Sequence, residues 1–210
     1  PINTPIENIL AFFCSSVCKN LRSYINPTIS FNIGDIERLP YIDTEQKINK
    51  NTEVLIKFSK SDWDSFETSW DFTTLPLLST DYSSNNLRNT YQSLRSHWQG
   101  MTDEMLKLEE DNNKIFIDAY GLQDELTPDV LIHEITLTCN PAYRYGQKVS
   151  KDDQETRLRA DTMKEFISYS VGCMFGRYAL EKPGLILANA GDTTETYIDK
   201  IPNPKFPADD

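Results

Sequence analysis

Apolar positions recur at alternating spacings of four and three residues between Leu87 and Leu122. Such a heptad pattern predicts a long helix whose apolar seam packs against a partner helix. At 1.5 Å per residue, one continuous helix over this segment would be about 54 Å long. We therefore expect a mainly α protein, a helical bundle built on this segment. The seam residues are Leu87, Tyr91, Leu94, Trp98, Met101, Met105, Leu108, Asn112, Ile115, Ala119 and Leu122.

Two residues of this segment bear on how the helix is built. Gly100 is a weak point, because a glycine inside a helix costs roughly 1 kcal/mol relative to alanine. Two shorter helices that meet near residues 99–102 are therefore the alternative geometry. Asn112 is the only polar residue on the seam. A lone buried asparagine at such a position more often fixes the packing register than carries chemistry.

Three further segments show helical spacing, namely residues 5–24, 44–66 and 151–180. The first ends before Asn26-Pro27 and the last before Pro183-Gly184, since proline and glycine stop helices. Small side chains in the last helix would let another helix approach closely. These small residues are Ser168, Ser170, Gly172 and Gly176.

One segment near residues 28–37 changes period from helical to alternating. Ile29, Phe31 and Ile33 alternate with polar residues, and Gly34-Asp35 supplies a turn. This pattern predicts a short β element. Residues 131–138, rich in β-branched side chains, are expected to form either a short strand or an extended connector.

The chain divides at a connector over residues 73–86, which is rich in serine, threonine and asparagine. We expect a helix-strand unit with a connecting helix over residues 1–72 and a helical spacer or C-terminal domain over 87–190. Beyond that, residues 191–210 show no periodicity and are expected to be a loop or tail.

Aromatic residues crowd into the segment just before this connector. They are interpreted as an anchor that pins a helix end to the body of the protein. The alternative is a stacking surface for DNA bases, but five neighbouring acids would repel a phosphate backbone. The aromatic residues are Trp63, Phe66, Trp70 and Phe72, and the acids are Asp62, Asp64, Glu67, Asp71 and Asp81.

The net charge of −11, with 32 acidic against 21 basic residues in a chain of 210, argues against a broad nucleic-acid surface. If DNA is touched, a local patch does it. Lys19, Arg22 and Arg38 cluster around the first helix and the β element and are the candidate phosphate contacts. The alternative for these three bases, which the composition favours, is an ordinary solvated face.

No apolar run is long enough for a membrane span, and the first residues lack the features of a signal peptide. The pattern predicts a cytoplasmic protein without a membrane partner. The proline at position 1 and the irregular last stretch indicate a piece of a longer protein.

Motifs for metal binding and catalysis are weak. Cys14 and Cys18 are four residues apart, but a disulfide within one helix has poor geometry and a zinc site needs further ligands, for which only His97 and His133 are available. We therefore expect reduced, buried cysteines and no metal. The sequence also lacks a phosphate-binding glycine loop, a nucleophile elbow and a metalloprotease motif.

The Asn140-Pro141-Ala142-Tyr143 segment is the strongest candidate for a catalytic motif. Amino-methylating enzymes use an Asn/Asp-Pro-Pro-Tyr turn at the end of a strand to grip the target nitrogen of a flipped base. Residues 135–139 could be that strand. However, the second proline is replaced by alanine, and none of the eight glycines forms the Gly-x-Gly turn that would hold a methyl donor. An ordinary turn, with Arg144 and Tyr145 packed nearby, is therefore favoured, and no catalytic or cofactor-binding residue is assigned.

Four phrases together resemble one family, the PglX-type adenine-specific DNA methyltransferases of BREX phage-defence systems. That family is related to type IIG restriction-modification enzymes. The resemblance covers most of the chain, from about Ile9 to Ala190. The phrases are NPTISFNIGDIERLP (26–40), SKSDWDSFETSWDF (59–72), LEEDNNKIFIDAYGLQDELTP (108–128) and FISYSVGCMFGRYALEKPGL (166–185).

The resemblance implies a parent enzyme that transfers a methyl group from S-adenosylmethionine to N6 of adenine in a non-palindromic DNA site. It also implies that the donor pocket and the catalytic turn lie upstream, and that the present chain is similar to a C-terminal part. Asn140–Tyr143 occupies a different place in the family pattern, so no catalytic role is carried over to it.

Two hypotheses follow from residues and resemblance together. In the first, the chain is a non-catalytic helical portion that supports target recognition and contacts DNA through Lys19, Arg22 and Arg38. In the second, it is an acidic platform that binds other defence proteins or a phage inhibitor. A free-standing methyltransferase that uses Asn140–Tyr143 is a minor third possibility.

Overall fold

The computed structural model describes residues 4–28, 30, 32–44, 47–206 and 208, and these residues form helices joined by loops, without a strand. This confirms the expectation of a mainly α protein. Ile29 and Phe31, which belong to the expected β element, lie outside the described residues. The chain forms two compact units. Unit 1 comprises Pro1–Ser59 and Met101–Ile135, and unit 2 comprises Lys60–Gly100 and Thr136–Asp210.

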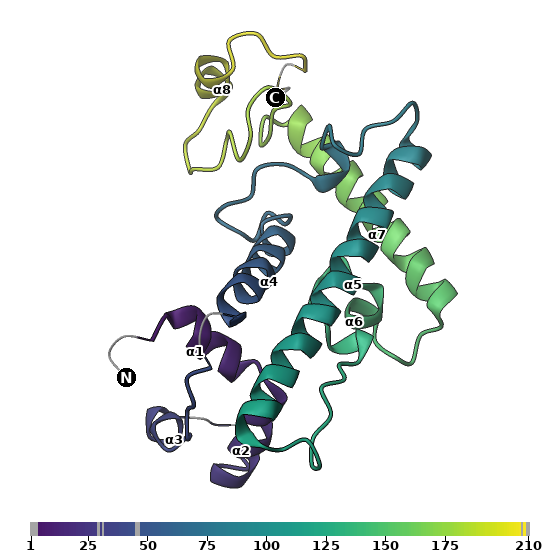
Figure 1. Cartoon of the computed structure of the whole chain (residues 1–210). Coiled ribbons are helices and arrows are strands. Elements are labelled where there is room, and N and C mark those ends of the chain that lie inside the picture. Colours follow the sequence, from purple (N-terminus) through teal and green to yellow (C-terminus); the bar gives the residue numbers. More distant parts are fainter. Residues whose placement is uncertain (1–3, 29, 31, 45–46, 207, 209–210) are drawn as a thin grey trace. The chain divides into compact units, whose positions relative to one another are not determined.

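The heptad segment forms one uninterrupted helix, α5 (Leu87–Tyr120), as Figure 1 shows. The alternative of two helices meeting near residues 99–102 is therefore wrong. The cost of Gly100 is outweighed by packing on both sides of it, because Leu94 is fully buried in unit 2 and Met105 is buried in unit 1.

Two helices form where one was expected at residues 5–24. They are α1 (Ile6–Phe13) and α2 (Ser16–Ile25), separated at Ser15. The Ser15 hydroxyl oxygen accepts a hydrogen bond of 3.2 Å from the backbone N–H of Cys18, so that Ser15 is the N-cap of α2. The apolar spacing continues across this break, and the spacing alone therefore did not reveal it.

The core of unit 1 is aromatic. The ring of Phe12, which is 1% exposed, lies 5.5 Å from the ring of Phe116 and stacks at 6.1 Å on that of Tyr120. These contacts join α1 to the second half of α5. The other buried residues of this cluster are Ala11, Val17, Cys18, Leu39 and Ile117.

The β element expected near residues 28–37 is wrong where the structure describes it, because α3 (Ile33–Glu37) forms there. The side chain of Asn32 accepts from the backbone N–H of Asp35, and the Asp35 carboxylate accepts from the backbone N–H of Asn32, both at 3.2 Å. This reciprocal capping box satisfies two backbone donors and starts a helix in place of a strand.

The helix expected at residues 44–66 is confirmed as α4 (Lys47–Trp63). The aromatic anchor that follows it is only partly as expected. Phe72 is buried against Tyr169, but Trp63 is 60% exposed and Trp70 is fully exposed. Two of the four rings therefore do not anchor the helix end.

The segment over residues 73–86, expected to connect domains, lies within unit 2 and contains a short 3-10 helix, η1 (Pro76–Leu78). Leu77 is buried in a cluster with Tyr91 and Leu94 of α5. The expected functional division of the chain at this segment stays a prediction.

The helix expected over residues 151–180 forms as α7 (Lys151–Met174) and ends six residues early. Gly176 has φ +70° and turns the chain away from the helix axis. The small residue Gly172 leaves room for a neighbouring side chain. The ring of Tyr178 lies there, so close that an added Cβ would be 2.4 Å from Tyr178 Cε2.

The structure also describes the two remaining segments, residues 131–138 and the C-terminal stretch. Residues 131–138 form the extended-connector alternative, with a 3-10 helix, η2 (Ile132–Glu134), rather than a strand. The expected loop or tail over residues 191–210 contains a helix, α8 (Thr194–Lys200), whose Tyr197 is 1% exposed. The Thr193 side chain caps this helix by accepting from the N–H of Thr196 at 3.4 Å.

Among the helices that the structure describes, none has the sustained apolar run that a bilayer span requires.

Candidate nucleic-acid interface and the Asn-Pro-Ala-Tyr turn

The three bases expected to touch phosphate all lie in unit 1. Lys19 and Arg22 are three residues apart on α2, which places them on neighbouring positions of one helix face. Arg38 is the C-terminal cap residue of α3. The structure therefore places two of the three predicted residues on one helix and the third at the end of another.

Lys19 is highly accessible to solvent. Its side chain is 82% exposed, and its Nζ lies 3.6 Å from Glu134 Oε1, which is itself 45% exposed. An exposed ion pair of this kind contributes about 0–1 kcal/mol and breaks easily when a stronger anion approaches. Lys19 is therefore available to a phosphate group.

Arg22 and Arg38 have different surroundings. Arg22 is half-buried, and its charge acts on the neighbouring thiol of Cys18. Arg38 is exposed. A hydrogen bond from Asn26, reinforced by the backbone of Asn32 and the charge of Arg38, keeps the pKa of Asp35 below its ordinary value. Arg38 therefore faces a carboxylate that stays ionised.

The Asn140-Pro141-Ala142-Tyr143 segment begins a short helix, α6 (Pro141–Tyr145). The Asn140 side-chain oxygen accepts a hydrogen bond of 3.1 Å from the N–H of Ala142, and Asn140 is 2% exposed. Residues 135–139 before it form a bend and a turn, not the strand of a methyltransferase site. The interpretation as an ordinary turn is therefore favoured by the local geometry.

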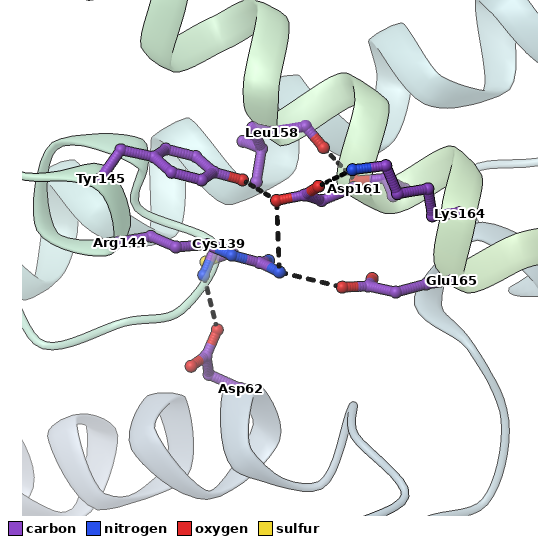
Figure 2. Close-up of polar contacts among 9 residues, drawn as sticks. Asp62, Cys139, Arg144, Tyr145, Leu158, Asp161, Lys164 and Glu165 are labelled. Carbon is purple, nitrogen blue, oxygen red and sulfur yellow. Dashed lines mark hydrogen bonds and ion pairs between the residues drawn. The ribbon is translucent and has the colours of Figure 1, made fainter. Parts of the chain in front are cut away.

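A polar network holds this turn in unit 2, as Figure 2 shows. The Asp62 carboxylate accepts hydrogen bonds from the backbone N–H groups of Thr138, at 2.6 Å, and Cys139, at 3.0 Å. Asp62 is 7% exposed, so these two donors satisfy a nearly buried charge. The contact fixes the chain just before Asn140 to the end of α4.

Arg144 and Tyr145 attach the same turn to α7. Arg144 Nη2 lies 3.0 Å from Glu165 Oε1, and the Tyr145 hydroxyl donates to Asp161 Oδ2 at 2.8 Å. Burial, followed by the hydrogen bond to Asp161, raises the pKa of Tyr145 well above its ordinary value. A tyrosine held neutral in this way acts as a hydrogen-bond donor, so the expected packing of Arg144 and Tyr145 near the turn is confirmed as a structural role.

Asp161 is held in its charged form. The hydrogen bond from Lys164, followed by that from Tyr145, keeps the pKa of Asp161 below its ordinary value. Burial, together with the nearby Asp62 carboxylate, strongly raises the pKa of the Cys139 thiol. The network thus contains an ionised acceptor and a protonated thiol, neither of which is set up as a base or nucleophile.

One carboxyl group of unit 1 has unusual electrostatics. Burial, and secondarily the charge of Glu134, raises the pKa of Glu109 to about 7. Cys14 lies nearby and is exposed as a whole residue, but its sulfur atom is partly desolvated. This partial burial, followed by the charge of Glu109, raises the pKa of Cys14. The neighbouring Glu110 accepts a backbone hydrogen bond from Val130 at 3.3 Å. The acidic run at 109–111 thus includes one residue that titrates near neutral pH.

The four cysteines are free thiols, and all but Cys14 are buried, so the expectation of buried cysteines is wrong for Cys14. In the part of the chain that the structure describes, no group of three histidine, cysteine or acidic side chains could hold a metal ion.

The remaining network residues were not found from the sequence. Asp62 contacts backbone groups 76 and 77 residues away, and no local pattern signals such a contact. Asp161 and Glu165 are four residues apart on α7, and this spacing was the one available hint that they share a partner.

Comparison with known proteins places the chain beside one class, the adenine-specific methyltransferases. It is 35% identical to the adenine-specific methyltransferase BrxX of Escherichia coli O9:H4 (strain HS) over 187 residues, which cover 89% of this chain and 15% of that protein. It is also 35% identical to the adenine-specific methyltransferase PglX of Lacticaseibacillus casei (strain Zhang) over 210 aligned residues, which cover 96% of this chain and 16% of that protein.

The chain therefore matches part of a PglX-type adenine-specific methyltransferase, and the resemblance predicted from the four phrases is confirmed. The chain spans only 15–16% of the length of these curated relatives. No protein-family model matches it.

Proposed function

We propose that this chain is a non-catalytic, C-terminal helical portion of an S-adenosylmethionine-dependent adenine-specific (N6) DNA methyltransferase of a bacterial phage-defence system of the BREX or restriction-modification type. In this proposal it supports target recognition by positioning DNA. The observation that carries it is the 35% identity, over 89% and 96% of the chain, to two adenine-specific methyltransferases.

The geometry around Asn140 supports a non-catalytic role. A methyltransferase turn must offer its side-chain oxygen to the amino group of the target base. The Asn140 oxygen instead accepts from the N–H of Ala142, and the side chain is almost fully buried. Presenting it to a base would uncap α6, which typically costs about 1 kcal/mol.

Lys19, Arg22 and Arg38 remain the candidate DNA contacts of the proposal. Phosphate contacts orient a protein on the duplex without reading the sequence, which fits a supporting role in target recognition. The acidic net charge of the chain predicts that such binding is weak and sensitive to salt.

The test is binding of a labelled duplex by the chain and by a variant in which Lys19, Arg22 and Arg38 are all replaced by alanine. We expect weak binding that drops further in the variant and at higher salt. A matched control replaces three exposed lysines of unit 1, Lys50, Lys107 and Lys114, by alanine. Equal loss in both variants would remove the predicted residues from the interface.

Calorimetry with S-adenosylmethionine tests the non-catalytic part of the proposal separately. We expect no heat of binding from this chain. Saturable binding that is lost in Asn140→Ala or Tyr143→Ala would overturn it in favour of a methyltransferase site at this turn.

A second candidate is an acidic protein-interaction domain that docks other defence components or a phage inhibitor. The observation that favours it is an exposed apolar stripe at helical spacing at the end of α7. This stripe comprises Ile167 (63% exposed), Val171 (43%), Met174 (56%) and Phe175 (64%). Co-purification of a defence protein that is lost in Ile167→Glu/Met174→Glu, without DNA binding at low salt, would support this candidate over the first.

A further inference from the structure

A groove in unit 2 runs between the start of α5 and α7, and Figure 1 shows the two helices crossing. Its volume is about 760 Å³. The side that α5 contributes includes Arg88 and Tyr91, and the side that α7 contributes includes Glu155, Thr156 and Arg159. Two guanidinium groups from different helices thus line one concave surface of an otherwise acidic chain.

Both arginines are available for an external partner. Arg88 and Arg159 are exposed, and neither forms an ion pair with any residue that the structure describes. Two unpaired guanidinium groups lining the same groove favour a ligand with negatively charged oxygens.

The single carboxylate lining the groove is already engaged. Arg95 donates to both oxygens of Glu155, from Nε at 2.8 Å and from Nη2 at 2.5 Å. This bidentate pair neutralises the charge of Glu155 locally. The charges of Arg88 and Arg159 are therefore not cancelled within the groove.

Tyr91 supplies an independent observation. Its residue is 9% exposed and lines the groove, yet its buried hydroxyl has no hydrogen-bond partner. Burial raises the pKa of Tyr91, and the charges of Glu155 and Arg159 also act on it, which places the hydroxyl near both groups. A buried hydroxyl without a partner costs stability unless a ligand accepts its hydrogen bond.

We propose that this groove binds the phosphate groups of the DNA backbone, with Arg88 and Arg159 as the charged contacts and the Tyr91 hydroxyl as a neutral donor. The inference rests on the proposed role in positioning DNA and assigns to that role a surface distinct from Lys19, Arg22 and Arg38. Arginine and tyrosine are both common donors to phosphate oxygens in DNA complexes.

The first test is the anisotropy of a labelled DNA duplex of about 20 base pairs, titrated with the full chain at several salt concentrations. In Arg88→Ala/Arg159→Ala we expect the slope of log affinity against log salt to fall by about 2, since two phosphate contacts are lost. Arg157→Ala is the matched control for Arg159→Ala, because Arg157 is also exposed on α7 but does not line the groove. We expect it to change affinity less than Arg159→Ala does.

Tyr91→Phe separates ligand binding from folding. Because the hydroxyl has no partner in the free chain, we expect its removal to leave the melting temperature unchanged or to raise it, while DNA affinity falls about threefold to tenfold. A variant that loses stability and retains affinity would show that the hydroxyl serves packing and not phosphate binding.

The outcomes distinguish the groove from the broader proposal. One outcome is that alanine at Lys19, Arg22 and Arg38 weakens DNA binding, while Arg88→Ala/Arg159→Ala has no more effect than Arg157→Ala. In that case the proposal that the groove binds phosphate is overturned and the proposed function stands. If the unaltered chain does not bind duplex DNA at low salt, both are overturned. Binding of a free nucleotide, tested with ATP, without binding of the duplex would also overturn the assignment to DNA.

Discussion

The side-chain Nδ2 of Asn112 donates a buried hydrogen bond of 2.9 Å to the backbone carbonyl of Ala11. The two residues lie 101 positions apart, on α5 and α1, and both belong to unit 1. The one polar residue of the heptad seam therefore meets a carbonyl near the end of a helix, as its expected role in fixing packing register implies. A shift of α1 along α5 would separate the two groups and break this hydrogen bond.

Asn112→Ala should destabilise the chain by about 1–3 kcal/mol, because it leaves the buried carbonyl of Ala11 without a donor. The urea midpoint measures this change. Asp111→Ala, at the exposed neighbouring position, is the control and should change stability little. Equal midpoints for the two variants would mean that the hydrogen bond does not align these helices.

Asp62→Ala should loosen the segment at Thr138 and Cys139, which precedes α6. The carboxylate accepts two backbone hydrogen bonds while nearly buried, so its loss should cost about 2–3 kcal/mol. Hydrogen exchange at the amides of Thr138 and Cys139 measures the effect locally. Asp71→Ala is the control, because Asp71 forms an exposed ion pair with Lys60. Unchanged exchange in Asp62→Ala would refute the bracing role.

The two glycines inside long helices should respond to alanine with opposite signs. At Gly100 of α5 an added Cβ meets no atom within 4 Å, so Gly100→Ala should stabilise the helix by about 0.5–1 kcal/mol. At Gly172 of α7 the added Cβ would collide with the ring of Tyr178, so Gly172→Ala should destabilise by about 1–3 kcal/mol. Thermal unfolding measures both, and the same sign for both would contradict the packing described.

The raised pKa of Glu109 predicts that the stability of the chain depends on pH. Its pKa is raised to about 7 by burial and by Glu134, whereas the unfolded chain has the ordinary value near 4.5. The folded state then binds more protons between these values, so the free energy of unfolding falls as pH rises from 4.5 to about 7. With allowance for solvent screening, the loss contributed by Glu109 is about 1–2 kcal/mol.

Glu109→Gln should remove this contribution. Denaturation measured at pH 4.5 and at pH 8 gives the stability difference between the variant and the unaltered chain at each pH. We expect this difference to favour the variant more at pH 8 than at pH 4.5. Glu104→Gln, at an exposed position of the same helix, provides the control. A stability difference that is the same at both pH values would contradict the raised pKa.

Long periodic segments were predictable because their signal is local and repeated. The heptad seam gave α5, and the spacing at 151–180 gave α7, because a solvent-facing helix must repeat its apolar face every three to four residues. The capping box of α3 was also visible as Asn32 followed by Asp35. The alternation of Ile29, Phe31 and Ile33 favoured a strand, and this signal was given more weight than the capping box.

Contacts between distant residues were not predictable in this way. The break at Ser15 leaves the apolar spacing intact, and the space beside Gly172 is filled by a ring from the following loop. The donors to Asp62 lie 76 and 77 residues along the chain. The candidate groove likewise depends on α5 and α7 lying together, which the isolated positions of Arg88 and Arg159 do not indicate.

The measurement that tests the central claim most directly is the affinity of this chain for duplex DNA across a series of salt concentrations. If the chain positions DNA through a few phosphate contacts, log affinity should fall linearly with log salt, with a slope of about −0.9 for each contact. No binding at the lowest salt concentration, or an affinity that does not change with salt, would contradict the account.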